Sequence, residues 1–499
     1  MSLLQVQIRD LIGFVQTRHS ILELKPDQKT NWLTFALSKH LIGEIDDAIN
    51  IIDIYLDTLT QGSGGSTNIP EFQCNYESSE LALYKNMLIC EKMEAQHQQA
   101  SKTATSTTTD SERCYKEPYD HLLSIQHLIT DKCSFFQSKA LYELRLGQFE
   151  DAKKTYLHLF DQLGATEDYK IHSGFMCSLL KLDTEKISYF YSLLEKPSVR
   201  KLVTGARTLA TIIPLSKQQK DVLYHEYSVS LANLYPKSHT IRRIPLTLLD
   251  HESKEWQYRF KTYVKKQIKS GVPSLGSDIA SLFLMEVNGK ACGTNGDKDL
   301  HSYYVIASDP CDIIIHPIYQ YCSRLVDEYI ASLEQSSKFP GDDDGDSTIE
   351  PPSTLLWAWY LRAVLYDLTG QYSKGLEYTT KCLDQTPTAV DVYELQGKLY
   401  EHGGDIHKAV SSTNEGRMLD KQDRYINNQT VKYLLRAGKE KEALETIALF
   451  TRHESEPEQN IYDMQCYWYE MELGKCLEKK GEMGKALKKF SKCINIAPL

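Results

Sequence analysis

The stretch GQYSKGLEY (370–378) decides the fold, because it returns in altered form as GDIHKAVSS (404–412) and GKEKEALET (438–446). In these three copies a glycine recurs every 34 residues, and a small residue follows it five positions later. The glycines are Gly370, Gly404 and Gly438, and the small residues are Gly375, Ala409 and Ala443. Further copies are GEIDDAINI (43–51), GQFEDAKKT (147–155) and GEMGKALKK (481–489). Similarity at such a fixed period is typical of proteins built from stacked repeats.

Aromatic residues and prolines complete the repeated unit around these glycines. Trp32, Trp359 and Tyr393 each stand eleven positions before a glycine, and Pro26, Pro387 and Pro498 close their units. The glycine supplies a left-handed turn between two helices, the small residue lets those helices approach closely, and the proline ends the second helix. This order resembles the tetratricopeptide repeat. It predicts an all-α fold, a right-handed superhelical solenoid of tetratricopeptide-like helix–turn–helix repeats.

The repeat signature and the composition divide the chain into four segments. We expect N-terminal tetratricopeptide-like repeats over residues 1–160, degenerate helical repeats over 161–337, an acidic linker over 338–352 and C-terminal tetratricopeptide repeats over 353–499. Inserts rich in Gly, Ser and Thr interrupt the first segment at 61–70 and 97–114. We interpret both as solvated loops and the second as disordered, because such residues favour turns over helices.

The register of the repeat also predicts incomplete ends. Pro26 occupies the closing position of a unit, so residues 1–26 hold little more than one helix of that unit. Pro498 closes another unit one residue before the end of the chain, with no polar capping helix after it. We therefore expect this chain to be a piece of a longer solenoid.

Composition and charge exclude several classes of protein. The 57 basic and 67 acidic side chains leave a net charge of −10, so we predict no DNA partner. The sequence shows no secretory signal and no apolar run of membrane-spanning length, so we predict no membrane association. The 12 cysteines follow no metal-binding spacing, and we predict no metal site. They indicate free thiols in a reducing compartment, which favours a cytoplasmic location.

No catalytic motif emerges from the sequence. The phosphate-binding loop, the serine nucleophile elbow, the zinc-protease helix and the dinucleotide fingerprint are all absent. The glycines of GKACGTNGDK (289–298) lack the Lys-Ser/Thr ending of a phosphate-binding loop, so we interpret them as a turn. The pattern [RQ]xxGx[GA], which cradles acetyl-CoA, is also missing. We predict no catalytic residue and no enzymatic activity for the chain alone.

Basic residues near the C-terminus are candidates for binding. Lys432, Arg436 and Lys439 share one helix face and its end, and Arg452 lies at the end of the next helix. Several converging cations suit a polyanion, because phosphates need multiple charge-assisted donors; a solvated helix face is the alternative. A further basic run is solvated or faces a partner; it comprises Lys475, Lys479, Lys480, Lys485, Lys488, Lys489 and Lys492. The leading positions of two repeats lack the Lys/Asn/Arg carboxylate clamp of chaperone adaptors; they hold Tyr360, Val364, Glu394 and Lys398.

Longer stretches resemble one family, the auxiliary subunits of the N-terminal acetyltransferase A (NatA) complex. They are SLLQVQIRDLIGFVQTRHSILELKPDQKTNW (2–32), ESSELALYKNMLI (77–89), YPKSHTIRRIPLTLL (235–249), DDDGDSTIEPPSTLLWAWYLRAVLYD (342–367), LDKQDRYINNQTVKYLLRAG (419–438) and MQCYWYEMELGKCLEKKGEMGKALKKF (464–490). These motifs are far more specific than the repeat itself. The resemblance covers most of the chain outside the low-complexity segments and places both of its ends inside the family's usual length.

This resemblance implies a non-catalytic, ribosome-associated scaffold that binds and orients a small acetyl-CoA-dependent catalytic subunit. Such a complex acetylates the α-amines of nascent chains during translation. The family also binds inositol hexakisphosphate as a structural ligand between the two subunits. The matching positions here are Lys432, Tyr433, Arg436 and Arg452. A stand-alone tetratricopeptide adaptor for protein–protein interaction is the alternative function.

Overall fold

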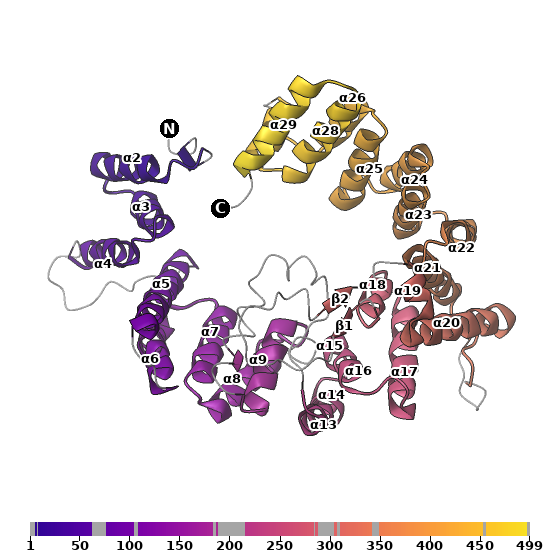
Figure 1. Cartoon of the computed structure of the whole chain (residues 1–499), viewed down its shortest axis with the longest axis horizontal. Coiled ribbons are helices and arrows are strands. Elements are labelled where there is room, and N and C mark those ends of the chain that lie inside the picture. Colours follow the sequence, from indigo (N-terminus) through magenta and orange to yellow (C-terminus); the bar gives the residue numbers. More distant parts are fainter. Residues whose placement is uncertain are drawn as a thin grey trace. The chain divides into compact units, whose positions relative to one another are not determined.

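The computed structural model describes residues 5–6, 8–61, 76–103, 108–182, 186–187, 215–283, 285–287, 304–306, 310–341, 349–452 and 456–496. The chain divides into two compact units, Met1–Leu249 (unit 1) and Asp250–Leu499 (unit 2). Within each unit, helices that are consecutive in sequence lie side by side (Figure 1).

Unit 1 is built from helices in its described residues. In chain order they are α2 (Leu11–Leu24), α3 (Lys29–Leu41), α4 (Ile45–Gln61), α5 (Tyr76–Thr103), α6 (Thr108–Ser124), the 3-10 turn η1 (Gln126–Leu128), α7 (Lys132–Arg145), α8 (Phe149–Asp161), α9 (Tyr169–Leu179), α13 (Lys217–His225), the π-helix η2 (Glu226–Leu231), α14 (Ala232–Leu234), α15 (His239–Arg243) and α16 (Pro245–Leu248). Neighbouring helices bury apolar side chains such as Phe35, Ile52 and Leu88 between them. Burial of this surface is the main force holding each repeat to the next.

Unit 2 contains helices and one small sheet. In chain order its elements are α17 (Lys254–Ser270), α18 (Leu275–Ala280), β1 (Met285–Val287), β2 (Tyr304–Ile306), α19 (Pro310–Ile315), α20 (Pro317–Ser336), α21 (Pro352–Leu368), α22 (Tyr372–Gln385), α23 (Val390–His402), α24 (Ile406–Leu419), α25 (Arg424–Arg436), α26 (Glu440–Ala448), α27 (Pro457–Asp463), α28 (Tyr467–Lys479) and α29 (Met483–Ile496). From α21 onward the helices form the successive pairs α21–α22, α23–α24, α25–α26 and α28–α29, with α27 as an additional helix before the last pair (Figure 1).

The repeat predicted from sequence is confirmed at its turns and crossings. All six glycines of the repeat adopt a positive φ, from 70° to 89°; they are Gly43, Gly147, Gly370, Gly404, Gly438 and Gly481. A left-handed conformation is costly for any residue with a Cβ, which explains the glycine. The small residues after them are buried, and a Cβ added to Gly375 would lie 2.8 Å from the Leu399 side chain. The all-α repeat fold is therefore confirmed.

In two units, the aromatic residue of the repeat donates a hydrogen bond to the proline that closes the preceding unit. Trp32 Nε1 donates a hydrogen bond to the carbonyl oxygen of Pro26 at 2.8 Å. In unit 2, the Tyr393 hydroxyl donates a hydrogen bond in the same way to the carbonyl oxygen of Pro387, at 3.0 Å. In both cases the donor lies six residues after the proline, where a helix has ended and left carbonyl groups without helical partners. The aromatic side chain thus satisfies the carbonyl group of the proline that ends the preceding unit.

The insert at 97–114 corrects our interpretation of a disordered loop. Residues 97–103 continue α5, and 108–114 form the first turns of α6, whereas residues 104–107 lie outside the described part of the chain. The Gln, Ala and Lys residues of the first part favour helices, and Cys114 is buried against the rest of the unit. Asn86 on α5 also donates to the Pro118 carbonyl of α6 at 2.7 Å. Tertiary packing outweighs the low helix propensity of the Ser and Thr residues. The insert at 61–70 lies outside the described residues after Gln61.

Two further features depart from the expected organisation. β1 and β2 pair antiparallel, with Met285 opposite Ile306, because their β-branched and aromatic residues suit a strand. The acidic linker is not solvated at its start: Phe339 is buried, edge-on to Tyr329 at 4.9 Å between ring centroids. Burying this ring outweighs the polarity of its neighbours. Residues 342–348, with the aspartates, and the turn predicted at 289–298 lie outside the described residues.

Candidate functional site: the charged face of α23, α25 and α28

The predicted binding residues lie on α25 and just after α26. Asp423 caps α25 by accepting a hydrogen bond from the Tyr425 backbone N–H at 2.7 Å. From that start, helical periodicity brings Lys432 and Arg436 to one side of α25, one turn apart. It turns Tyr433 into the core, where its side chain is only 6% exposed. Burial raises the pKa of the Tyr433 phenol. Tyr433 is therefore a packing residue in this structure.

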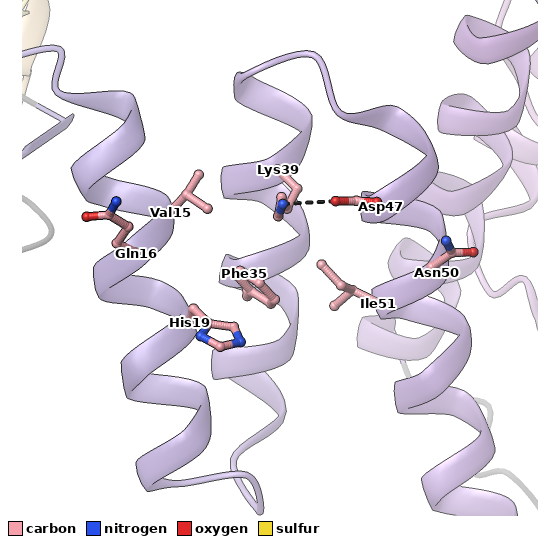
Figure 2. Close-up of a pocket in the computed structure, with 8 residues that line it drawn as sticks. All are labelled: Val15, Gln16, His19, Phe35, Lys39, Asp47, Asn50 and Ile51. Atoms are coloured by element: carbon pink, nitrogen blue, oxygen red, sulfur yellow. Dashed lines mark hydrogen bonds and ion pairs between the residues drawn. The ribbon is translucent and has the colours of Figure 1, made fainter.

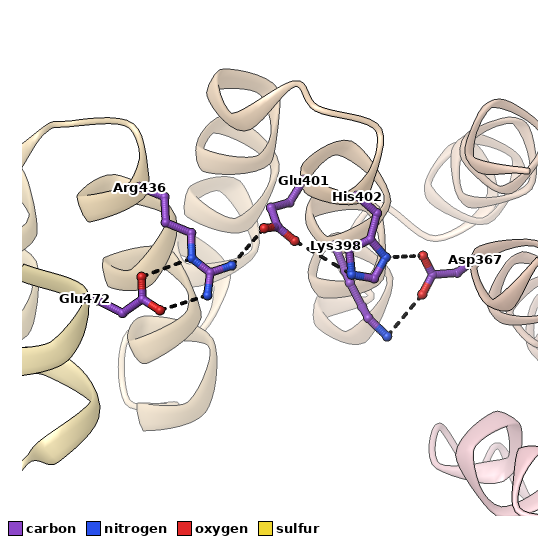
Figure 3. A network of polar contacts seen from close by, with 6 residues as sticks. All are labelled: Asp367, Lys398, Glu401, His402, Arg436 and Glu472. Atoms are coloured by element: carbon purple, nitrogen blue, oxygen red, sulfur yellow. Dashed lines mark hydrogen bonds and ion pairs between the residues drawn. The ribbon is translucent and has the colours of Figure 1, made fainter. Parts of the chain in front are cut away.

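Arg436 is held by two carboxylates from the neighbouring repeats. Its Nε and Nη2 donate to the two oxygens of Glu472 on α28, at 3.1 and 3.0 Å, and its Nη1 donates to Glu401 on α23 at 2.8 Å (Figure 3). Two parallel bonds to one carboxylate make a strong, directional pair. The hydrogen bonds that Arg436 donates to Glu472 raise the pKa of Arg436. Burial alone would raise the pKa of Glu472. The hydrogen bonds from Arg436 and its positive charge have the larger combined effect, so the pKa of Glu472 is lowered.

The acidic and basic side chains continue in a row across successive repeats, which we call the charge ladder. Its members are Asp367, Lys398, Glu401, His402, Arg436 and Glu472 (Figure 3). Asp367 is almost fully buried and is bonded by His402 Nδ1 at 2.6 Å and by the Lys398 ammonium at 3.1 Å. A buried carboxylate is stable only when such partners satisfy it. The ladder therefore joins α21, α23, α25 and α28.

Lys432 and Arg452 have different surroundings. The Lys432 ammonium lies 5.3 Å from the ring centroid of Trp468 on α28, a distance suited to a cation–π contact. Its side chain is half-buried. Arg452 is exposed after α26, and its backbone N–H donates to the Asn460 side chain at 3.3 Å. The fit to a polyphosphate is thus partial: Lys432 lies against Trp468, and a phosphate at Arg436 would have to displace Glu401 or Glu472.

Sequence reasoning identified the cations of this face and missed the carboxylates that bind them. A signal exists for one of them in the repeat period. Glu401 stands 35 residues before Arg436, close to the 34-residue period. Glu472 stands 36 residues after Arg436, but that repeat is lengthened to 43 residues, so the two are not at equivalent positions. The period therefore indicated Glu401 and gave no signal for Glu472.

A cavity of about 400 Å³ opens among α2, α3 and α4 of unit 1 (Figure 2). Its walls combine Phe35 and Ile51 with polar groups of His19, Lys39 and Asp47. The Lys39 ammonium and the Asp47 carboxylate are 2.9 Å apart, and their hydrogen bond lowers the pKa of Asp47. Glu44 also bonds to the Lys39 ammonium, so the cation of this cavity is already paired with two carboxylates.

Neither metal ligands nor a membrane span appear in the described part of the chain. Among the described residues, no group of three or more His, Cys, Asp or Glu side chains is placed to hold a metal ion. No described helix is long and apolar enough to cross a membrane.

Comparisons with known proteins agree with the resemblance seen in the sequence. The family model described as "N-terminal acetyltransferase A, auxiliary subunit" matches residues 76–292 and 319–496. The auxiliary subunit NAA15 of the Arabidopsis thaliana complex is 30% identical over 490 residues, which cover 98% of this chain and 44% of that protein. The human NatA auxiliary subunit N-alpha-acetyltransferase 16 is 28% identical, over 98% of this chain and 45% of that protein.

A solved structure extends the similarity to the fold. The structure of Naa15/Naa10 bound to HypK-THB matches with a TM-score of 0.60 and 25% identity, covering 99% of this chain and 59% of the matched chain. This chain spans less than half the length of the curated relatives it matches. Since the family model covers well over half of its residues, the chain belongs to the family of auxiliary subunits of the N-terminal acetyltransferase A complex.

Proposed function

We propose that this chain is a non-catalytic scaffold subunit that binds and orients a small acetyl-CoA-dependent catalytic subunit. In this role it supports co-translational acetylation of nascent-chain N-termini at the ribosome. The observation that carries the proposal is the family membership, together with a solved relative in which Naa15 is in complex with Naa10. A repeat solenoid suits this task, because stacked helices present an extended surface to a partner.

The chemistry of the described side chains supports a scaffold. Several charged groups of the C-terminal repeats bond to one another, as in the charge ladder. Burial raises the pKa values of three buried cysteines, Cys177, Cys322 and Cys382, to about 12 each. These three are neutral thiols near neutral pH and lack the thiolate that nucleophilic catalysis needs.

Co-expression with a Naa10-type catalytic subunit from the same organism tests this function. We expect both proteins to elute as one complex in size-exclusion chromatography with light scattering, with a mass above the 57.1 kDa of this chain. We expect the complex to acetylate peptides that begin with Ser or Ala faster than the catalytic subunit does alone. Separate elution, with unchanged N-terminal acetylation in cells lacking this chain, would favour the stand-alone adaptor. Acetyl transfer by this chain alone would contradict a non-catalytic role.

The inositol hexakisphosphate site remains part of this proposal, with a narrower set of residues. Lys432 and Arg452 support it through their charge, while Tyr433 is in the core and Arg436 is bonded to two carboxylates. Calorimetric titration of inositol hexakisphosphate into the co-expressed complex tests it. Lys432→Met keeps an unbranched side chain of similar size and removes the charge that lies over Trp468, and we expect it to weaken binding about tenfold or more. Lys421→Met changes an exposed lysine outside this face and is the control. Equal affinities in the two variants would refute the site.

A further inference from the structure

A groove with an apolar floor and a basic rim lies among α26, α27, α28 and α29. Its volume is about 460 Å³. Leu444, Tyr469, Leu473 and Leu477 form the floor; Leu444 is partly exposed, whereas the other three are buried in the core of the C-terminal repeats. Such a floor attracts an apolar side chain rather than an ion, because contact removes apolar surface from water.

An extension of the repeat shapes this groove. Gly438 and Gly481 are 43 residues apart, nine more than the 34-residue period. The additional residues include α27, which contributes Glu458 to the groove wall. α26 and α29, the second helices of consecutive repeats, both line the groove, although they share few direct contacts. The groove is thus a property of this junction and not of the regular repeat.

The rim is predominantly positive. The lysines that line the groove outnumber its two glutamates, Glu440 and Glu458; they are Lys441, Lys485, Lys488, Lys489 and Lys492. Internal ion pairs account for part of this charge. Lys489 is buried and lies 3.2 Å from both Glu458 and the fully buried Glu470. Lys492 lies 3.8 Å from Glu470, and Lys485 lies 2.6 Å from Glu482. Glu440 is itself taken by Lys480 at 3.3 Å.

Two rim lysines are left for a partner. Lys441 on α26 and Lys488 on α29 are both exposed, and neither forms an ion pair within the described residues. They belong to the two helices that flank the apolar floor. A ligand that spans the groove would therefore meet a cation from each helix and an apolar surface between them.

We propose that this groove binds an acidic amphipathic segment of a partner protein. A large apolar side chain of the segment packs on the partly exposed Leu444, above the buried Leu473 and Leu477, and Asp or Glu residues on either side of it bond to Lys441 and Lys488. Charge complementarity selects the acidic segment, and the apolar floor distinguishes it from a small polyanion, which would leave that floor uncovered. This inference is independent of the proposed acetyltransferase role.

Selection from a random peptide library tests the proposal with the whole chain. We expect the enriched peptides to carry Asp or Glu within a few positions on both sides of a large apolar residue. Their affinities are then measured by fluorescence anisotropy. Lys441→Glu combined with Lys488→Glu should weaken binding at least about tenfold, because attraction becomes repulsion. Replacing the central apolar residue of the peptide by Ala should cause a loss of similar size.

Matched controls make the outcome decisive. Lys421→Glu combined with Lys479→Glu introduces the same charge change at exposed lysines that do not line the groove, and should leave binding nearly unchanged. Circular dichroism establishes that the variants are folded. Enrichment of neutral or basic peptides, no enrichment, or equal binding to the groove and control variants would overturn the proposal. Competition with inositol hexakisphosphate is a further test. If it displaces the peptides completely, and if replacing the peptide's apolar residue by Ala does not change the affinity, the groove is a small-anion site and the proposal is overturned.

Discussion

In unit 1, His172 on α9 is completely buried and fully hydrogen-bonded. Its Nε2 lies 2.9 Å from the Thr166 carbonyl oxygen, and its Nδ1 lies 3.0 Å from the Tyr227 hydroxyl. Because a carbonyl only accepts, Nε2 carries the proton and Nδ1 accepts from Tyr227. The imidazole also stacks on Phe160, with the ring centroids 4.6 Å apart. Burial lowers the pKa of His172 to about 4, despite the nearby Glu167 and Asp168, which act to raise it.

This environment predicts acid sensitivity. The pKa of His172 in the folded state lies below the value of about 6.5 for an unfolded histidine, so the unfolded chain binds more protons between those values. The stabilising contribution of the neutral ring is complete above pH 6.5 and is lost as the pH falls toward 4, up to about 3 kcal/mol. We expect His172→Gln to lower the melting temperature at pH 7.5 but to flatten its fall between pH 6.5 and 4.5. Thermal unfolding followed by circular dichroism measures both slopes, and parallel curves would contradict the assignment.

At the scale of the element, the crossing of α23 and α24 shows why the repeat needs small residues. Ala409 on α24 is completely buried, and its carbonyl oxygen accepts a hydrogen bond from the Thr413 hydroxyl at 2.9 Å. A Cβ added to Gly397 on α23 would lie 3.3 Å from that same carbonyl oxygen and 2.4 Å from the Thr413 side chain. Both helices therefore contribute a small residue to one close approach.

A larger side chain at this crossing should destabilise unit 2. We expect Ala409→Leu to cost about 1–3 kcal/mol, because extra methylenes in a filled core force neighbouring side chains or helices apart. His407→Leu introduces the same side chain two residues away at an exposed position and is the control. Melting temperatures of the two variants and the parent chain give the comparison. Equal destabilisation by both substitutions would show that the effect comes from helix propensity or surface hydrophobicity and not from the crossing.

At the scale of the whole molecule, each compact unit has its own core and its own source of stability. The core around Phe35 and Ile52 belongs to unit 1, and that around Val431 and Leu477 belongs to unit 2. In repeat proteins each element depends mainly on its neighbours in sequence. A destabilising substitution should therefore affect only the helices near it.

Hydrogen exchange measured by mass spectrometry checks this locality. We expect Ala409→Leu to accelerate amide exchange in α23, α24 and α25 and to leave α7, α8 and α9 unchanged. His172→Gln should show the opposite distribution, with faster exchange in α8, α9 and η2, which carries Tyr227, and no change in α23, α24 and α25. The two variants control for each other in the same experiment. Changes spread over both units by either substitution would contradict independent stability.

The sequence by itself determined the repeat, its turns and its close crossings, because each depends on a local property of one residue. Gly404 is needed where the backbone turns left-handed, and Ala409 where two helices nearly touch, so both appear at a fixed period. The motifs quoted from the sequence also identified the family. The helical insert at 108–114 escaped prediction, because the burial of Cys114 depends on residues far away in the sequence.

Only the tertiary structure decided how the charged side chains are used. Arg436 looked available from its own helix, yet Glu401 and Glu472 reach it from the repeats on either side. Lys489 is likewise satisfied by two carboxylates, whereas Lys441 and Lys488 face the groove without an ion pair in the described residues. Spacing along one helix gives the direction of a side chain but not what opposes it. Electrostatic interactions act through space, so the partner of each charge is known only once the repeats are stacked.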